Sequence, residues 1–357
     1  MGCLSVIVPA YNRANLIGLT LRSLLVQTLP ADEIIVVDDG SMDNTAEVAE
    51  SFGLPVKVIR RQNGGPAAAR NTGFANSNGQ FIHFFDSDDL AAPNKLETQV
   101  NALERTGADI AIGPWIQGKF SGSSFLASNN VLQQRGLPKG LSLIKALLTH
   151  WSFMPHSAMF RRSIVEKSGG FDESLFVAED QLMFLNCLLA GAKVVHTPET
   201  IEFYRVGDAS KITENEEWSV RKWHEWACFL VKSREACLKK GIEPLHWFGY
   251  RRRLWEVEQD MRYANYKDAT LMSGLRALIA SGTHKSFYRW HRQIERWLGG
   301  LQQRLTGGRA HCSFRIGKIT PEQIVQLEKL GYRYEPPKRL PWHPQKDVRS
   351  DHALADS

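Results

Sequence analysis

Short runs of β-branched and other apolar residues alternate with helical patterns along the first half of the chain. The runs predict strands at 4–8, 33–37, 56–60, 81–85 and 109–112. Helical patterns fall between them, and this alternation is typical of βαβ units, in which the strands are parallel. The sequence therefore predicts an α/β fold with an open, mostly parallel central sheet flanked by helices. Ligands of such sheets bind beyond the carboxyl ends of the strands.

Three helices in this half have recognisable ends. Asn12 is expected to cap the first, whose apolar face consists of Leu16, Ile17, Leu21, Leu24 and Leu25. Ser41 or Asp43 is expected to cap the second, which Gly53 closes. The third is expected to end at Gly107.

The pattern changes near residue 210, where long helical stretches rich in Trp and Arg begin. We therefore expect an α/β domain at 1–210 and a helical region at 211–306. The last segment, 307–357, is polar and contains Pro, and we expect a mostly flexible tail. Its one expected helix is Pro321–Leu330.

Charge is distributed unevenly. The net charge is +6, and the excess of Lys and Arg lies between Ile201 and Arg309. A basic surface favours anionic partners, and lipid head groups, lipid-linked phosphates and nucleic acid are all open on composition alone.

The sequence shows no targeting pattern. Its first residues lack the basic and apolar segments of a secretory signal, and no apolar stretch reaches the roughly 18 residues of a membrane span. The five cysteines are odd in number and form no CxxC pair, which favours reduced thiols. We therefore expect a cytoplasmic protein.

Two polar motifs follow the first two predicted strands. Pro9-Ala10-Tyr11-Asn12 comes after one, and Asp38-Asp39-Gly40-Ser41 comes after the other. The Tyr11 ring can stack on a nucleotide base, and a carboxylate such as Asp39 can accept a hydrogen bond from a ring N–H. Each motif alone also fits ordinary turn chemistry.

A glycine-rich loop at 63–66 leads into a helix that carries Arg70 in its first turns. Glycines let a ligand approach the backbone, and a helix start with an arginine favours phosphates. The loop is neither a Walker loop nor a GxGxxG fingerprint. A phosphate site and a plain loop with an exposed arginine both remain open.

Three carboxylates, Asp86, Asp88 and Asp89, crowd the end of an apolar strand. Solvent or a bound cation must relieve their mutual repulsion. Carboxylate oxygens suit Mg²⁺ or Mn²⁺, which also bind substrate phosphates. Because a strand of buried type leads directly into the cluster, we favour a metal site over a solvated turn.

Two further candidates lie in the next hundred residues. Glu179 and Asp180 precede an apolar helix, where a carboxylate either caps the helix or acts as a general base. His156 either lines an acceptor site or is a hydrogen-bonded structural histidine, which we favour.

Taken together, these motifs resemble family 2 glycosyltransferases. The first four, and Gly170-Phe171-Asp172 with Glu179-Asp180, occur in the order and approximate spacing of that family over about residues 3–205. The resemblance implies a GT-A fold. It also implies transfer of a sugar from a nucleotide diphosphate sugar, with inversion of the anomeric centre and with a divalent cation, Mn²⁺ or Mg²⁺.

The resemblance further implies a role for each matching residue. The donor-nucleotide contacts would be Pro9, Tyr11, Asn12, Asp39, Arg70, Asp86 and Asp88. Asp88 and Asp89 would hold the metal. Asp180 would be the catalytic base, with Glu179 near the acceptor.

One departure from the family concerns the metal. Members often carry a histidine shortly after a Tyr-Arg pair, whereas Tyr204-Arg205 is followed by Val-Gly-Asp-Ala-Ser. A metal ligand from that position is therefore in doubt.

We expect the donor to be a UDP-sugar and the acceptor to be a glycan or a lipid-linked glycan, in the synthesis of a cell-envelope or extracellular polysaccharide. We expect no nucleic-acid partner. The basic and aromatic stretches at 251–253 and 284–305 either pack on the catalytic domain, which we favour, or contact an anionic membrane peripherally.

The sequence fits two other functions less well. A nucleotidyltransferase needs a glycine- and lysine-rich loop at the first strand, and residues 9–12 offer none. A non-catalytic protein that binds sugar nucleotides or anionic polymers would be served poorly by the clustered carboxylates.

Overall fold

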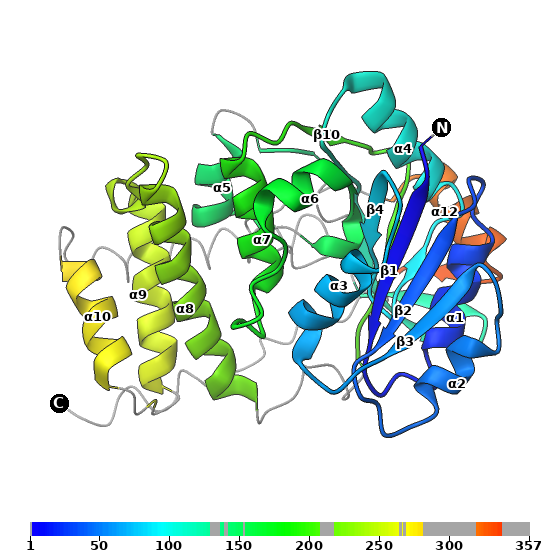
Figure 1. Ribbon diagram of the computed structural model, residues 1–357, viewed down its shortest axis with the longest axis horizontal. Coiled ribbons are helices and arrows are strands. Elements are labelled where there is room, and N and C mark those ends of the chain that lie inside the picture. The colour runs from blue at the N-terminus through cyan, green and yellow to red at the C-terminus, as the bar shows by residue number, and fades with distance from the viewer. Residues whose placement is uncertain are drawn as a thin grey trace.

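The computed structural model describes residues 2–128, 136–138, 142–152, 154–207, 218–263, 266, 269–280 and 319–337. A seven-stranded sheet forms the centre of the α/β half, and a five-stranded sheet lies beside it. Three helices, α8 (Trp218–Leu238), α9 (Phe248–Tyr263) and α10 (Ala269–Ala280), stand side by side at the end of the molecule opposite the smaller sheet (Figure 1).

The larger sheet has the strand order β10-β6-β9-β4-β1-β2-β3. Its strands are β1 (Leu4–Ala10), β2 (Glu33–Asp38), β3 (Val56–Arg60), β4 (Phe81–Phe84), β6 (Ile110–Ile112), β9 (Ala158–Arg161) and β10 (Val194–His196). Neighbours are parallel except at β9, which runs antiparallel to β4 and β6. The predicted, mostly parallel sheet is thus confirmed, and the five predicted strands lie close to their expected bounds.

Apolar residues on both faces of β1 explain why helices cover both faces of this sheet. Val6 and Val8 pack with α1 (Ile17–Leu25) and α4 (Lys95–Thr106). Ile7 points to the other face, where α3 (Gly65–Ala75), α6 (Arg162–Ser168) and α7 (Glu179–Leu189) lie.

One predicted helix cap is wrong. The first helix begins at Ile17 rather than after Asn12, and Asn12 instead bonds to the loop after β2. The second helix, α2 (Thr45–Glu50), follows Asn44, whose side chain makes no capping bond, but the carboxylate of the predicted Asp43 accepts from the Thr45 amide at 3.1 Å. Gly107 ends α4 in the left-handed conformation, as predicted.

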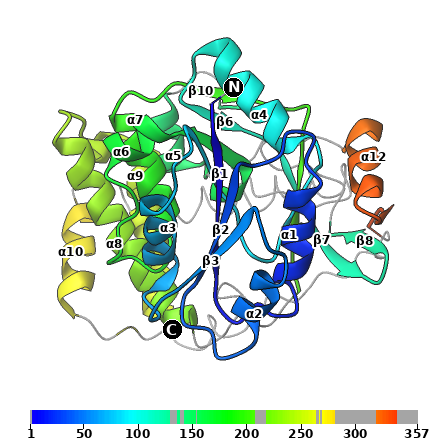
Figure 2. The same ribbon diagram turned by 45° about the vertical axis from the view of Figure 1, so that its right-hand side comes forward.

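The second sheet was not predicted. Its order is β12-β8-β7-β11-β5, with β5 (Leu90–Ala91), β7 (Trp115–Ser121), β8 (Ser124–Ala127), β11 (Glu202–Arg205) and β12 (Arg333–Glu335). The predicted helix near the C-terminus is α12 (Pro321–Lys329), and it lies beside β7 and β8 (Figure 2). The described part of the predicted tail, 319–337, therefore packs on this sheet.

The helical region continues the core of the α/β half. Residues of α5 (Leu143–Thr149), α7, α8 (Trp218–Leu238), α9 (Phe248–Tyr263) and α10 (Ala269–Ala280) belong to one hydrophobic cluster. Arg253 in α9 donates to the Leu147 carbonyl oxygen at 2.7 Å and lies over the Trp226 ring. The predicted boundary at 210 and the basic stretch at 284–305 lie outside the described residues.

Among the described helices, none combines the length and the apolar character needed to cross a membrane.

Candidate active site

The loops after β1 and β2 are joined at the carboxyl edge of the larger sheet. Asn12 has a left-handed backbone, with φ at 51°, which its short polar side chain tolerates. Its side-chain oxygen accepts from the Met42 amide at 2.9 Å, and its own amide donates to Ser41 Oγ at 2.9 Å. Pro9 lies within β1, whereas Tyr11 is 42% exposed. The two loops are therefore fixed while the Tyr11 ring stays accessible.

Asp39 holds the glycine-rich loop. Its Oδ2 accepts from the amides of Gly64 and Gly65 at 3.2 and 2.7 Å, and Arg61 Nη1 lies 3.1 Å from its Oδ1. Burial raises the pKa of Asp39, although these donors lower it. Gly65 has a φ of +89°, and a Cβ there would lie 2.8 Å from Phe176, so glycine is needed. The residue predicted to contact the base also shapes the loop that follows β3.

Arg70 is buried within α3 rather than exposed. Its Nη1 donates to Glu179 Oε1 at 2.7 Å, and its Nη2 donates to Asp86 Oδ1 at 3.0 Å. Burial opposes its positive charge, but the carboxylates of Asp86 and Glu179 outweigh burial and raise the pKa of Arg70. The side chain predicted to contact the donor nucleotide, at its diphosphate or its uridine, thus ties the start of α7 to the residues after β4.

The acidic loop, residues 86–89, connects β4 to β5. Asp86 is partly exposed, Asp88 is mostly buried and Asp89 is fully buried. Asp88 Oδ2 lies 3.7 Å from Arg13 Nε. Asp89 Oδ1 accepts from the Arg205 amide at 2.8 Å, and Arg205 Nε donates to the Asp88 carbonyl oxygen at 2.9 Å. The end of β11 therefore fixes this loop from the side of the smaller sheet.

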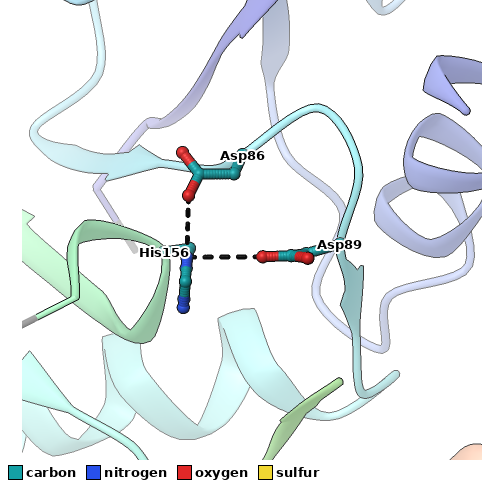
Figure 3. A group of neighbouring side chains, drawn as sticks. All are labelled: Asp86, Asp89 and His156. Carbon is teal, nitrogen blue, oxygen red and sulfur yellow. Dashed lines mark hydrogen bonds and ion pairs between the residues drawn. The ribbon is translucent and has the colours of Figure 1, made fainter. Parts of the chain in front are cut away.

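His156, from the short 3₁₀ helix η1 (Pro155–Ser157), reaches two carboxylates of this loop (Figure 3). Its Nδ1 lies 2.8 Å from Asp86 Oδ2 and 3.4 Å from Asp89 Oδ2. Burial alone would raise the pKa of Asp86, but the hydrogen bond from His156 and the charge of Arg70 lower it. These are the contacts of a hydrogen-bonded histidine, and they belong to the acidic loop. A contact between His156 and an acceptor remains a prediction.

Asp86, Asp89 and His156 also fit a divalent cation. One ligand atom of each lies within 4.8 Å of the other two, and carboxylate oxygens with one imidazole nitrogen suit Mn²⁺. The second oxygen of each carboxylate is held by a donor, Arg70 on Asp86 and the Arg205 amide on Asp89. Such outer contacts orient metal ligands.

This group differs from the predicted ligands, Asp88 and Asp89. Asp89 is in it, Asp88 is not, and the Asp88 carboxylate faces Arg13 instead. His156 joins the group from a segment that no metal motif marked. A direct contact of Asp88 with the metal or the donor remains a prediction.

The start of α7 carries the two predicted acceptor-side carboxylates. Asp180 accepts hydrogen bonds from the backbone and side chain of Gln181, at 2.7 and 3.1 Å. Burial raises the pKa of Asp180. Burial and the neighbouring Asp180 together raise the pKa of Glu179 to about 7. A carboxylate with a raised pKa is a stronger proton acceptor once it is ionised.

Sequence reasoning missed an ion pair behind the acidic loop. Lys95 Nζ lies 3.2 Å from Glu202 Oε2, and both side chains are fully buried. Burial raises the pKa of Glu202 and lowers that of Lys95, and each charge opposes the shift of the other. The two residues begin a helix and a strand, where a charged side chain is usually exposed, so no sequence signal marked them. The Tyr-Arg pair marks Arg205 in the sequence, but it does not indicate that Arg205 contacts the acidic loop.

Comparison with known proteins identifies the family of this chain. The sequence model of "Glycosyl transferase family 2" matches residues 5–169. An uncharacterised glycosyltransferase of Rickettsia typhi, RT0329, is 31% identical over 246 residues, which are 66% of this chain and 75% of that protein. The succinoglycan biosynthesis protein ExoW of Rhizobium meliloti is 32% identical over 212 residues, 55% of this chain and 66% of that protein. A Rickettsia felis relative is longer, and the match spans 40% of its length.

Solved structures share the fold. S. aureus TarS 1–349 in complex with UDP-GlcNAc has a TM-score of 0.54 and 19% identity, over 79% of this chain and 93% of that chain. The mannosyltransferase PcManGT of Pyrobaculum calidifontis, in complex with GDP-Man and Mn²⁺, has a TM-score of 0.51 and 18% identity, over 87% and 85%. The fold is therefore of the GT-A type. The chain belongs to the family 2 glycosyltransferases.

Proposed function

We propose that this protein transfers a sugar from a nucleotide diphosphate sugar to a glycan or lipid-linked glycan, with inversion at the anomeric carbon. Family membership supports the reaction class. The observation that carries the proposal is the Arg70 bridge, which joins Glu179, next to the candidate base, to Asp86 in the acidic loop. A base and a leaving group must be held close together for an in-line displacement.

The residues divide the chemistry between two sides of the sugar. Asp86, Asp89 and His156 would hold a divalent cation, which would supply positive charge to stabilise the leaving diphosphate. Asp180 accepts the proton of the acceptor hydroxyl, and that oxygen attacks the anomeric carbon as the diphosphate departs from the opposite face. Tyr11 and Asp39 bind the nucleotide base. Inversion follows because attack and departure are on opposite faces.

For the donor we propose a UDP-sugar, and for the pathway the synthesis of a cell-envelope or extracellular polysaccharide at the cytoplasmic side. Support comes from the UDP-GlcNAc complex of TarS and from the succinoglycan biosynthesis named for ExoW. The GDP-Man complex of PcManGT makes GDP-sugars the donors to compare first.

The first test is the release of nucleoside diphosphate from a panel of UDP-, GDP- and dTDP-sugars with Mn²⁺ or Mg²⁺. We expect release from one donor, lost on addition of chelator and in Asp88→Ala. The protein would be a non-catalytic binder of sugar nucleotides if a nucleotide sugar binds but no nucleoside diphosphate forms from it, even with a panel of glycan and lipid-linked acceptors.

Asp180→Asn tests the base. Asn has almost the same shape but cannot take a proton, so kcat is expected to fall by about 100- to 10,000-fold while donor affinity stays unchanged. Turnover is measured by diphosphate release and donor affinity by calorimetry. Asp172→Asn is the matched control, because Asp172 pairs with Lys232 on the surface. Wild-type turnover in Asp180→Asn would remove this residue from the mechanism.

A further inference from the structure

The ion pair of Lys95 and Glu202 is unusual because both side chains are fully buried. Removing two charges from water costs several kcal/mol for each ion, and a pair of apolar residues of similar size often stabilises a protein as well or better. Stability alone therefore does not explain this pair. Its position offers another explanation, because it lies directly behind His156.

His156 contacts charged groups through both of its ring nitrogens. Nδ1 faces Asp86 and Asp89, whereas Nε2 lies 3.6 Å from Glu202 Oε1. That distance is an electrostatic contact slightly longer than a hydrogen bond. The ring of Trp115 packs edge-on to the imidazole, with centroids 6.4 Å apart, and the Tyr204 ring lies 5.3 Å from the imidazole and 5.6 Å from the Trp115 ring. The imidazole is therefore in contact with two aromatic rings as well as with the three carboxylates.

We propose that Glu202 is a positioning residue for the cation site: it accepts the Nε2–H of His156, so that the Nδ1 lone pair is free for a cation held by Asp86 and Asp89, in place of the hydrogen bond that Nδ1 makes with Asp86 without the cation. Lys95 compensates the buried charge of Glu202. The imidazole of a metal-binding histidine generally donates its second N–H to a carboxylate or a carbonyl group, which fixes both the tautomer and the ring orientation. This inference rests on the cation site of the proposed function.

The arrangement also accounts for the missing histidine after Tyr204-Arg205. The imidazole comes instead from η1, and its outer partner Glu202 is the first residue of β11, the strand that also carries Tyr204 and Arg205. Because the Arg205 amide holds Asp89, β11 supports two of the three candidate ligands. In this chain the candidate histidine ligand thus comes from η1, and β11 contacts both it and Asp89.

Two double variants isolate the hydrogen-bond acceptor at position 202. The first is Lys95→Met/Glu202→Gln, and the second is Lys95→Met/Glu202→Leu. Each variant removes the two buried charges and keeps similar side-chain volumes, so both variants are expected to fold. Only the first retains an oxygen that can accept from His156 Nε2–H. Thermal unfolding of each variant establishes that they are equally folded. Glu243→Gln, which breaks a pair with Arg234 elsewhere on the molecule, is the control.

The measurements are Mn²⁺ affinity by calorimetry and pulsed EPR of bound Mn²⁺, which detects a coordinated nitrogen. Nitrogen coupling is expected in the wild type, in Glu243→Gln and in Lys95→Met/Glu202→Gln. The Mn²⁺ affinities of these three proteins are expected to lie within about threefold of one another. Lys95→Met/Glu202→Leu is expected to bind Mn²⁺ about 10- to 100-fold more weakly than wild type and to lose the nitrogen coupling. The same loss of coupling is expected for His156→Ala.

Two results would overturn the inference in distinguishable ways. If Lys95→Met/Glu202→Leu binds Mn²⁺ with wild-type affinity and wild-type nitrogen coupling, Glu202 does not position His156, and the cation site itself stands. If wild type binds no Mn²⁺ or shows no nitrogen coupling, His156 is not a ligand, and the cation site of the proposed function fails with the inference.

Discussion

At the residue scale, Glu179 and Asp180 are two adjacent carboxylates next to one buried arginine. Arg70 bonds directly to Glu179, whereas Asp180 receives its hydrogen bonds from Gln181. Burial and the charge of Asp180 raise the pKa of Glu179 to about 7. Acids that interact this strongly titrate as a pair, so the charge on one sets how readily the other ionises.

Asp180→Asn is therefore expected to lower the pKa of Glu179 below about 7. The change removes the negative charge that opposes the ionisation of Glu179 and leaves the positive charge of Arg70 in place. The pKa of Glu179 is measured by NMR of carboxyl-labelled protein, with Glu173→Gln as the control from the same segment. A pKa that stays in place or rises would contradict the coupling.

Residue types were easier to predict from the sequence than their partners. The motifs identified Asp39, Arg70 and the acidic loop as candidates because these polar residues follow strands. They did not show that Arg70 is buried against Glu179, which is 109 residues away. Nor did they reveal Glu202, because a lone acidic residue at a strand start looks like a surface residue. Both contacts depend on how elements that are distant in the sequence pack together, which no local pattern encodes.

At the element scale, the position of Arg70 depends on how closely α3 approaches the larger sheet. The helix presents small buried residues to β1 and β2, including Ala67, Ala69 and Gly73. A Cβ at Gly73 would lie 2.3 Å from Ile7 Cγ2 and 3.2 Å from Val37 Cγ2. Any larger residue would push the helix away from the sheet, and Arg70 would move with it.

Gly73→Ala is expected to lower the free energy of unfolding by about 1–3 kcal/mol, because the added methyl group overpacks the core. Urea unfolding measures this. Gly274→Ala is the matched control, since Gly274 is also helical and nothing lies within 4 Å of a Cβ there. That change is expected to raise stability by roughly 0.5–1 kcal/mol. The close packing of α3 would be refuted if both variants gained stability.

Of the predicted strands, β1, β2, β4 and β6 are nearly unbroken apolar runs that are buried on both faces, whereas β3 at the sheet edge exposes Lys57 and Arg60. The smaller sheet lacked such a signal. β5 has two residues, and β7 is interrupted by the polar side chains of Gln117 and Lys119. Its pairing of β7 with β11 and of β8 with β12 joins segments that are distant in the chain. Short, mixed strands with distant partners leave no local pattern.

At the scale of the whole molecule, the described part of the C-terminal segment completes the smaller sheet. β12 pairs with β8, and Leu327 of α12 is fully buried in the hydrophobic cluster of that sheet. Gln323 Nε2 donates to the carbonyl oxygens of Pro198 and Thr200, just before β11. The C-terminal helix thus supports the strand that holds the acidic loop.

Leu327→Ala is expected to lower the free energy of unfolding by about 2–5 kcal/mol, because it leaves a cavity in that cluster. Val325→Ala, in the same helix but 45% exposed, is expected to change it by less than about 0.5 kcal/mol. Chemical denaturation of the two variants gives the comparison. Equal losses would mean that α12 is not anchored through Leu327.

The bond between the Arg205 amide and Asp89 also sets an order of events during synthesis. The two residues are 116 positions apart, and a ribosome adds about 5–20 residues per second. Asp89 therefore emerges roughly 6–23 seconds before the group that holds its carboxylate. During that interval the nascent chain can already build β1, β2 and β4, but its acidic loop still lacks a fixed shape. The α/β half can thus begin to fold well before the contact that fixes its acidic loop can form.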